Sequence, residues 1–125
     1  MKTVISSPDA PAAVGPYVQA IKANGFVFIS GCIPLEPEKN TVADGGIKAQ
    51  TRQAMQNLQS ILNTDGLTFS HIVKTTCFIS DMGNFSEFNE EYASFFTEPF
   101  PARSCVEVSR LPKGVLIEVE AIACE

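Results

Sequence analysis

The last apolar segment of the chain, Val115 to Cys124, constrains the fold most, because its two alternating sets of side chains differ in chemistry. Side chains alternate between the two faces of a strand. One set is entirely apolar, namely Val115, Ile117, Val119, Ala121 and Ala123. The other set mixes apolar and acidic residues, namely Leu116, Glu118, Glu120, Ile122 and Cys124. The segment therefore predicts a strand with one face under helices and the other against an identical subunit, since the second face is too apolar for water and too charged for a core.

Four more apolar segments supply further strands. An Asn24-Gly25 pair marks a tight turn between two of them, because both residues tolerate the backbone angles of a two-residue hairpin. A loop rich in proline, glutamate and glycine follows from Pro34 to Gly46. The predicted strands cover Tyr17 to Lys22, Phe26 to Gly31, Ile72 to Ile79, Phe100 to Val108 and Val115 to Cys124.

Two segments place apolar or small residues three and four positions apart, which predicts two amphipathic helices. The stripes are Ile47, Thr51, Ala54, Leu58 and Ile61 in the first helix and Phe85, Phe88, Tyr92, Phe95 and Phe96 in the second. The aromatic stripe would suit a ligand platform, but packing on a sheet explains it more simply. The order strand, strand, helix, strand, helix, strand, strand predicts an α+β fold with both helices on one face of the sheet.

The ends of these helices also have recognisable signals. Asp65-Gly66 follows the first helix, as is common at a helix C-terminus. Asn84 with Glu87 three positions later resembles a capping box at the start of the second helix. Pro99 and Pro101 then prevent that helix from continuing.

Composition narrows the classes of function. The chain has 125 residues, 45% of them hydrophobic, which suits one domain over residues 1–125. A formal charge of -5 and only 9 scattered basic residues argue against a nucleic-acid surface. The N-terminal segment is too polar for a signal peptide or a membrane span, so we expect a cytoplasmic protein without a membrane partner.

The cysteines and the single histidine limit the chemistry further. Cys32, Cys77, Cys105 and Cys124 lie far apart, without a Cys-x-x-Cys motif. Because each falls in an apolar strand, we expect buried free thiols rather than disulfides, and no zinc site. His71 has no acid or nucleophile at a suitable spacing, which favours a surface position and argues against Ser-His-Asp chemistry.

Arg103 is the charged residue that most needs an explanation, because it lies in the apolar segment Phe100 to Val108. On a strand it shares a face with Cys105 and Glu107. Two interpretations are open. Arg103 is either a structural partner for Glu107 or Glu120, or a guanidinium that binds an anionic ligand.

The position of Glu118 depends on how the last two strands pair. If Leu111 to Gly114 closed a tight hairpin, Arg103 would lie opposite residue 122, with Glu118 about 13 Å away at about 3.3 Å per residue. A site that contains both Arg103 and Glu118 would then need a different strand order or a neighbouring subunit.

Five segments together resemble the Rid family of reactive-intermediate deaminases, also described as enamine/imine deaminases. They are Ala10 to Tyr17, Ile29 to Gly31, Phe95 to Glu98, Phe100 to Val108 and Ile117 to Ala123. The resemblance spans essentially the whole chain, and the Pro-Ala-Arg-Ser block joined to the Glu-Val-Glu-Ala strand is its most specific part. It implies a chorismate-mutase-like α+β fold, with a mixed sheet, that forms a homotrimer with sites between subunits. It also implies hydrolysis of 2-imino acids and their enamine tautomers, such as 2-aminoacrylate, to 2-oxo acids and ammonia, with no metal or organic cofactor.

The resemblance also implies roles for particular residues. Arg103 would bind the substrate carboxylate through two hydrogen bonds, and Glu118 would orient the hydrolytic water and exchange its proton. Glu120 lies on the same face as Glu118 and stays an alternative to it. The remaining substrate-binding positions correspond to Tyr17, Ser30, Gly31, Asn89 and Cys105.

Each of these positions also has a structural interpretation. Tyr17 could be a strand aromatic, Ser30 a turn residue, Asn89 a solvent-facing helix residue, and Cys105 a small apolar filler rather than a thiolate of lowered pKa. Two other function classes stay open: a sensor that binds small carboxylic acids without turnover, and RNA cleavage or a holdase role as ascribed to some relatives. The acidic charge weighs against RNA, and the sequence reserves no obvious apolar patch for a holdase.

Overall fold

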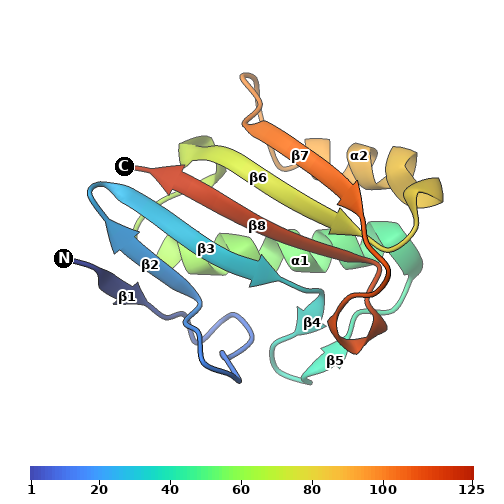
Figure 1. Cartoon of the computed structure of the whole chain (residues 1–125), viewed down its shortest axis with the longest axis horizontal. Coiled ribbons are helices and arrows are strands. Elements are labelled where there is room, and N and C mark those ends of the chain that lie inside the picture. Colours follow the sequence, from blue (N-terminus) through green and yellow to red (C-terminus); the bar gives the residue numbers. More distant parts are fainter.

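A computed structural model describes the whole chain, residues 1–125, as a six-stranded sheet with two helices on one face (Figure 1). The strands are ordered β1-β2-β3-β8-β6-β7 across the sheet. Their bounds are Thr3–Ile5 (β1), Ala20–Ala23 (β2), Phe26–Cys32 (β3), Ile72–Ile79 (β6), Ala102–Glu107 (β7) and Ile117–Cys124 (β8). Leu35–Glu36 (β4) and Thr41–Val42 (β5) form a separate small ribbon. The helices are Gly46–Thr64 (α1) and Phe85–Ala93 (α2), and neither is both long and apolar enough to cross a membrane.

Chain connections explain the direction of each strand. β6 and β7 are joined through α2, and a crossover of this kind produces a parallel pair. All other neighbours in the large sheet are antiparallel. The last strand, β8, inserts between β3 and β6, so β7 is left as an edge strand of the sheet. Three short 3-10 turns complete the chain, at Phe69–His71 (η1), Met82–Asn84 (η2) and Pro112–Gly114 (η3).

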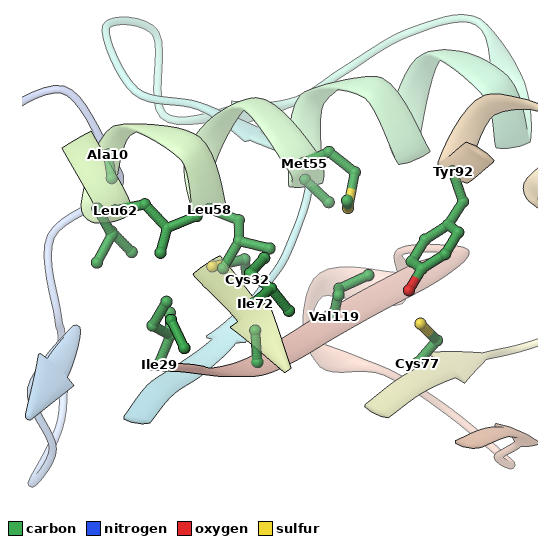
Figure 2. Packing of buried hydrophobic residues seen from close by; sticks show 14 of the residues in the cluster. Ala10, Ile29, Cys32, Met55, Leu58, Leu62, Ile72, Cys77, Tyr92 and Val119 are labelled. Atoms are coloured by element: carbon green, nitrogen blue, oxygen red, sulfur yellow. The ribbon is translucent and has the colours of Figure 1, made fainter. Parts of the chain in front are cut away.

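The core lies between the sheet and the helices, as the two-faced pattern of the last strand predicts. The apolar set of β8 is almost completely buried there, with Ile117, Val119 and Ala123 fully inaccessible. From α1, Met55, Leu58 and Leu62 pack down toward the sheet (Figure 2). The α+β fold with both helices on one face is therefore confirmed.

The opposite face of the sheet is not covered by any other element (Figure 1). It carries the second side-chain set of β8, which is half-buried or exposed. Phe26 and Phe28 are register partners of Cys124 and Ile122, so they share this face, and they are 40% and 46% exposed. Val106, level with Phe78 and Glu118, extends the face to the far edge and is 45% exposed. An uncovered sheet face with this much exposed apolar surface is typical of an interface. The expectation that the chain reserves no apolar patch is therefore wrong.

Some local predictions are wrong at the ends of elements. The strand expected from Tyr17 to Lys22 begins only at Ala20, because Pro16 interrupts the backbone before it and the Gln19 side chain binds the N-terminal segment instead. The strands β1, β4 and β5 were not predicted, since they are two or three residues long.

The second helix also differs from the prediction in two ways. It ends at Ala93 rather than continuing through Phe96, although Phe95 and Phe96 still pack against Phe69. Asn84 makes no side-chain capping bond, because the 3-10 turn that precedes α2 already includes it. The first helix ends at Asp65-Gly66 as expected, with Gly66 at φ 73°.

Candidate functional site

A cleft of about 590 Å³ lies at the end of β3, between the N-terminal segment and the turn η3. Its floor includes the carboxylates Glu118 and Glu120 of β8. Four of the predicted site residues line it: Tyr17, Ser30, Gly31 and Glu118. The structure therefore brings four of the seven predicted site residues together within one chain.

A bulge in β3 shapes the wall of the cleft. The pairing of β3 with β8 shifts register between Ile29 and Cys32, which leaves Ser30 and Gly31 outside the regular ladder. Ser30 then bonds back to the preceding segment: its N–H donates to Gln19 O at 2.9 Å and its hydroxyl to Val18 O at 2.7 Å. These two bonds hold the segment that carries Tyr17, so Ser30 has a structural role in this chain.

Gly31 accommodates the Glu118 carboxylate. A Cβ atom at Gly31 would overlap Oε2 of Glu118 and would lie 2.8 Å from its Cδ. The side chain of Glu118 thus occupies the space that any other residue at position 31 would fill. Absence of a side chain, rather than a left-handed backbone, is the property needed at this position.

Burial changes the acid-base properties of the cleft. Partial burial raises the pKa of Glu118, and the neighbouring carboxylate of Glu120 raises it further. Burial also raises the pKa of the Cys32 thiol to about 12, with Glu118 contributing, so this cysteine stays neutral. A carboxyl group whose pKa is raised in this way is better suited to exchange protons than one with an ordinary pKa.

The other predicted residues, Arg103, Asn89 and Cys105, lie outside this cleft, at the β7 edge and α2. The Arg103 guanidinium is held by α2. Its Nη1 donates to Asn89 Oδ1 at 2.8 Å, and its Cζ lies 4.9 Å from the Tyr92 ring centroid and 5.6 Å from that of Phe85. Asn89 therefore positions Arg103 rather than facing solvent alone.

Within the chain no carboxylate pairs with Arg103, so a structural ion pair with Glu107 or Glu120 of the same chain is not formed. Glu107 instead accepts a hydrogen bond from the Met82 N–H at 2.7 Å. Glu120 lines the cleft on the opposite face of the sheet. Most of the guanidinium donors of Arg103 have no partner within the chain.

Cys105 is a neutral thiol beside this arginine. Burial raises the pKa of Cys105, although Arg103 acts in the opposite direction. A thiolate of lowered pKa is therefore not supported. All four cysteines are free, as expected, but only Cys32 and Cys77 are buried, whereas Cys105 and Cys124 are half-buried. Tyr92 lies between α2 and the sheet, where its hydroxyl is 2.7 Å from Thr75 Oγ1 (Figure 2).

The two groups of residues face opposite sides of the sheet. In the register of the sheet, Arg103 is the partner of Thr75, and Thr75 is the partner of Ala121. Thr75 and Ala121 are buried under the helices, so Arg103 lies on the helix side of the sheet. Glu118 is level with Phe78 on the uncovered face. The tight hairpin considered for Leu111 to Gly114 does not form, because β6 separates β7 from β8. Arg103 and Glu118 of one chain therefore cannot contact the same small ligand.

Sequence reasoning missed several residues at these sites. Lys113 of η3 and Asn57 of α1 line the cleft. Asn57 donates to the carbonyls of Ile33 and Leu35, at 3.0 and 2.9 Å, and so fixes the chain that leaves β3. The Pro-Lys-Gly run signals a turn that presents a lysine, but its position at the cleft depends on the fold. The chain has no group of three or more His, Cys, Asp or Glu residues that could hold a metal ion.

Comparisons with known proteins place this fold and these residues in a family. The family model described as endoribonuclease L-PSP matches residues 7–125. A 2-iminobutanoate/2-iminopropanoate deaminase of Salmonella typhimurium is 48% identical over 98% of both chains. A Rid family protein of Yersinia pestis, of unknown function, superimposes with a TM-score of 0.97, 47% identity and 100% coverage of both chains. Escherichia coli TdcF, solved with bound serine, gives a TM-score of 0.94, 40% identity and 98% coverage of both chains.

The chain belongs to the Rid family. The resemblance identified from the Pro-Ala-Arg-Ser and Glu-Val-Glu-Ala segments is thereby confirmed.

Proposed function

We propose that this protein hydrolyses 2-imino acids and their enamine tautomers, such as 2-aminoacrylate, to 2-oxo acids and ammonia. The observation that carries the proposal is Arg103, a half-buried guanidinium bonded to a neutral amide and paired with no carboxylate. A guanidinium presents a planar fork of N–H donors that fits a carboxylate, the one permanent charge of an imino acid. Relatives at 47% and 48% identity are named 2-iminobutanoate/2-iminopropanoate deaminases, which supports an imino acid over other ligands that carry a carboxylate.

Glu118 has the properties of the group that handles the proton. Water from solvent attacks the C=N carbon of the protonated imine while the Glu118 carboxylate accepts one of its protons, which forms a neutral tetrahedral amino alcohol. Glu118 returns this proton to the nitrogen, and the C–N bond breaks to release ammonia. The remaining hydroxyl proton passes to the Glu118 carboxylate, and from there to solvent, as the carbonyl group of the 2-oxo acid forms. A pKa raised by burial and by Glu120 suits a carboxyl group that must both accept and return a proton. Positioning of the water and the substrate supplies much of the acceleration.

The complete site is proposed to form between identical subunits in a homotrimer. Within one chain, Arg103 and Glu118 lie on opposite faces of the sheet, so a ligand that contacts both needs a second copy. The uncovered face, with Phe26, Phe28 and Val106 exposed, offers an apolar surface for that assembly. Tyr17, Ser30, Gly31 and Glu118 would come from one subunit. Asn89, Arg103 and Cys105 would come from its neighbour.

Other functions fit the structure less well. An RNA phosphodiester would meet two carboxylates and one lysine in the cleft, and the chain carries a formal charge of -5. A sensor that binds a small carboxylic acid without turnover would use the same Arg103, and TdcF with bound serine supports small-molecule binding in this family. The expected cytoplasmic location and the single domain remain predictions.

The test is a coupled assay on the purified protein. An amino-acid oxidase or a serine/threonine dehydratase generates the imine in situ, and release of ammonia and 2-oxo acid is followed. We expect wild type to accelerate release, and Arg103→Ala to remove that acceleration while the oligomer stays intact. Arg110→Ala is the matched control, because Arg110 is exposed, does not line the cleft and takes part in none of the ion pairs of the chain.

The outcomes separate the two candidate functions. An Arg103→Ala variant with the full wild-type rate contradicts the role given to the guanidinium. If wild type shows no acceleration but binds 2-oxobutanoate, the sensor function replaces the deaminase function.

A further inference from the structure

Lys113 carries the only positive charge among the residues that line the cleft. The other charged residues there are the carboxylates Glu118 and Glu120. Lys113 is exposed, and it takes part in none of the five ion pairs of the chain. Its ammonium group is therefore available to an anion that comes from outside the chain.

The backbone fixes the lysine at this place. Lys113 has φ 58° and ψ 19°, in the left-handed region that non-glycine residues rarely adopt. Pro112 precedes it, and Gly114 at φ 66° continues the turn. The turn is closed by bonds from Gly114 N–H to Leu111 O and from Val115 N–H to Pro112 O. Strained residues of this kind occur preferentially at ligand sites, where the surrounding structure maintains them.

The electrostatics of the cleft give this lysine a function. The proposed substrate is an anion, whereas the cleft contributes two carboxylates and the whole chain has a formal charge of -5. A carboxylate that approaches Glu118 is therefore repelled unless a cation offsets the local potential. Lys113 is the one residue of the cleft wall that can do so.

We propose that Lys113 is a specificity residue that recognises the carboxylate of anionic substrates as they pass Glu118 and Glu120. This assignment rests on the proposed function for the nature of the ligand. Lys113 acts during approach and binding, and Arg103 of the neighbouring subunit holds the carboxylate in the complete site. Lys113 does not take part in proton transfer, so its removal affects KM rather than kcat.

The experiment compares Lys113→Gln, Lys113→Arg and the control Lys2→Gln in the assembled protein. Glutamine and arginine have the same backbone preferences as lysine, so the strained turn is unchanged between variants. Lys2→Gln removes the same charge at an exposed position that does not line the cleft. Imine hydrolysis and the affinity for 2-oxobutanoate are measured between about 0.01 M and about 1 M salt, where the Debye length falls from about 30 Å to about 3 Å.

For Lys113→Gln in low salt, we expect KM for the imine and Kd for 2-oxobutanoate to rise by about threefold to tenfold, with kcat nearly unchanged. The difference from wild type should shrink in high salt, Lys113→Arg should restore both constants, and Lys2→Gln should match wild type. Unchanged KM and Kd in low salt overturn the assignment, as does a rise that is independent of salt. If wild type does not hydrolyse imines but Lys113→Gln still weakens 2-oxobutanoate binding, the proposed function fails and the assignment of Lys113 holds.

Discussion

At the scale of single residues, the contact between Gly31 and Glu118 makes the cleft possible. The β3 bulge brings the Gly31 backbone against the carboxylate, and a side chain at position 31 would take the same space. The Glu118 side chain thereby lies against the bulge, which would restrict where its oxygens place a water molecule in the proposed site. Positioning of this kind requires a small residue and a rigid backbone together.

We expect Gly31→Ala to destabilise the fold by about 1–3 kcal/mol, because the new methyl group overpacks against Glu118. In a Glu118→Ala background the same substitution should cost much less, since the carboxylate is gone. The measurement is a double-mutant cycle on the free energy of unfolding. Equal costs in the two backgrounds would show that the clash is with something other than Glu118.

At the scale of elements, α2 acts as the support for Arg103. The aromatic stripe interpreted from the sequence as helix packing has two roles in the structure. Phe88 and Tyr92 are buried, and Phe85 and Tyr92, together with Asn89 outside the stripe, surround the guanidinium. One buried hydrogen bond, between Tyr92 and Thr75, links this helix to β6. The position of Arg103 on the edge strand therefore depends on how α2 is seated on the sheet.

Tyr92→Phe should lower the free energy of unfolding by about 1–2 kcal/mol, because the buried Thr75 hydroxyl then keeps only the weak bond from the Cys77 thiol at 3.9 Å. Adding Thr75→Val should recover most of this loss, since neither polar atom then remains unpaired. Chemical denaturation of the three variants measures both effects. If the Tyr92 hydroxyl stabilised the fold through another contact, Thr75→Val would not restore the free energy of unfolding.

At the scale of the whole molecule, the two faces of the sheet decide how a site can be built. Arg103 lies on the helix side of the edge strand and Glu118 on the uncovered side of β8. A trimer in which each uncovered face meets a neighbour would bring the two groups together between chains. The catalytic unit would then be the assembly rather than the folded chain.

Subunit mixing tests this arrangement directly. Arg103→Ala and Glu118→Gln should each be inactive alone, but an equal mixture that is refolded together should recover activity at about one quarter of the sites, because each site takes one residue from each of two randomly chosen chains. Native mass spectrometry checks that mixed trimers form. Mixed trimers without activity would contradict a shared site.

The elements could be predicted from the sequence because their signals are local. The three- and four-residue spacing in α1 and α2 and the alternation in β8 each report which side of one segment is buried. Errors are confined to short or irregular pieces. At the start of β2 the Gln19 side chain binds the N-terminal segment, and at Asn84 a 3-10 turn takes the place of the expected cap.

The site could be predicted only in part. Most of the functional residues were identified from segments that the chain shares with the Rid family. Arg103 and Glu118 were predicted to act in one site. Their separation onto opposite faces was not visible, because it depends on β6 lying between β7 and β8. The cleft position of Lys113 and the fit of Glu118 over Gly31 likewise depend on chain segments far apart in the sequence.

The sequence alone therefore determined the class of fold, the two-faced last strand and the family, since each follows from side-chain periodicity or from a contiguous motif. Only the tertiary structure decided the strand order, the β3 bulge and the division of the site residues into two groups. The physical reason is that strand pairing is set by hydrogen bonds between distant segments, and no local pattern of side chains encodes which strand becomes a neighbour.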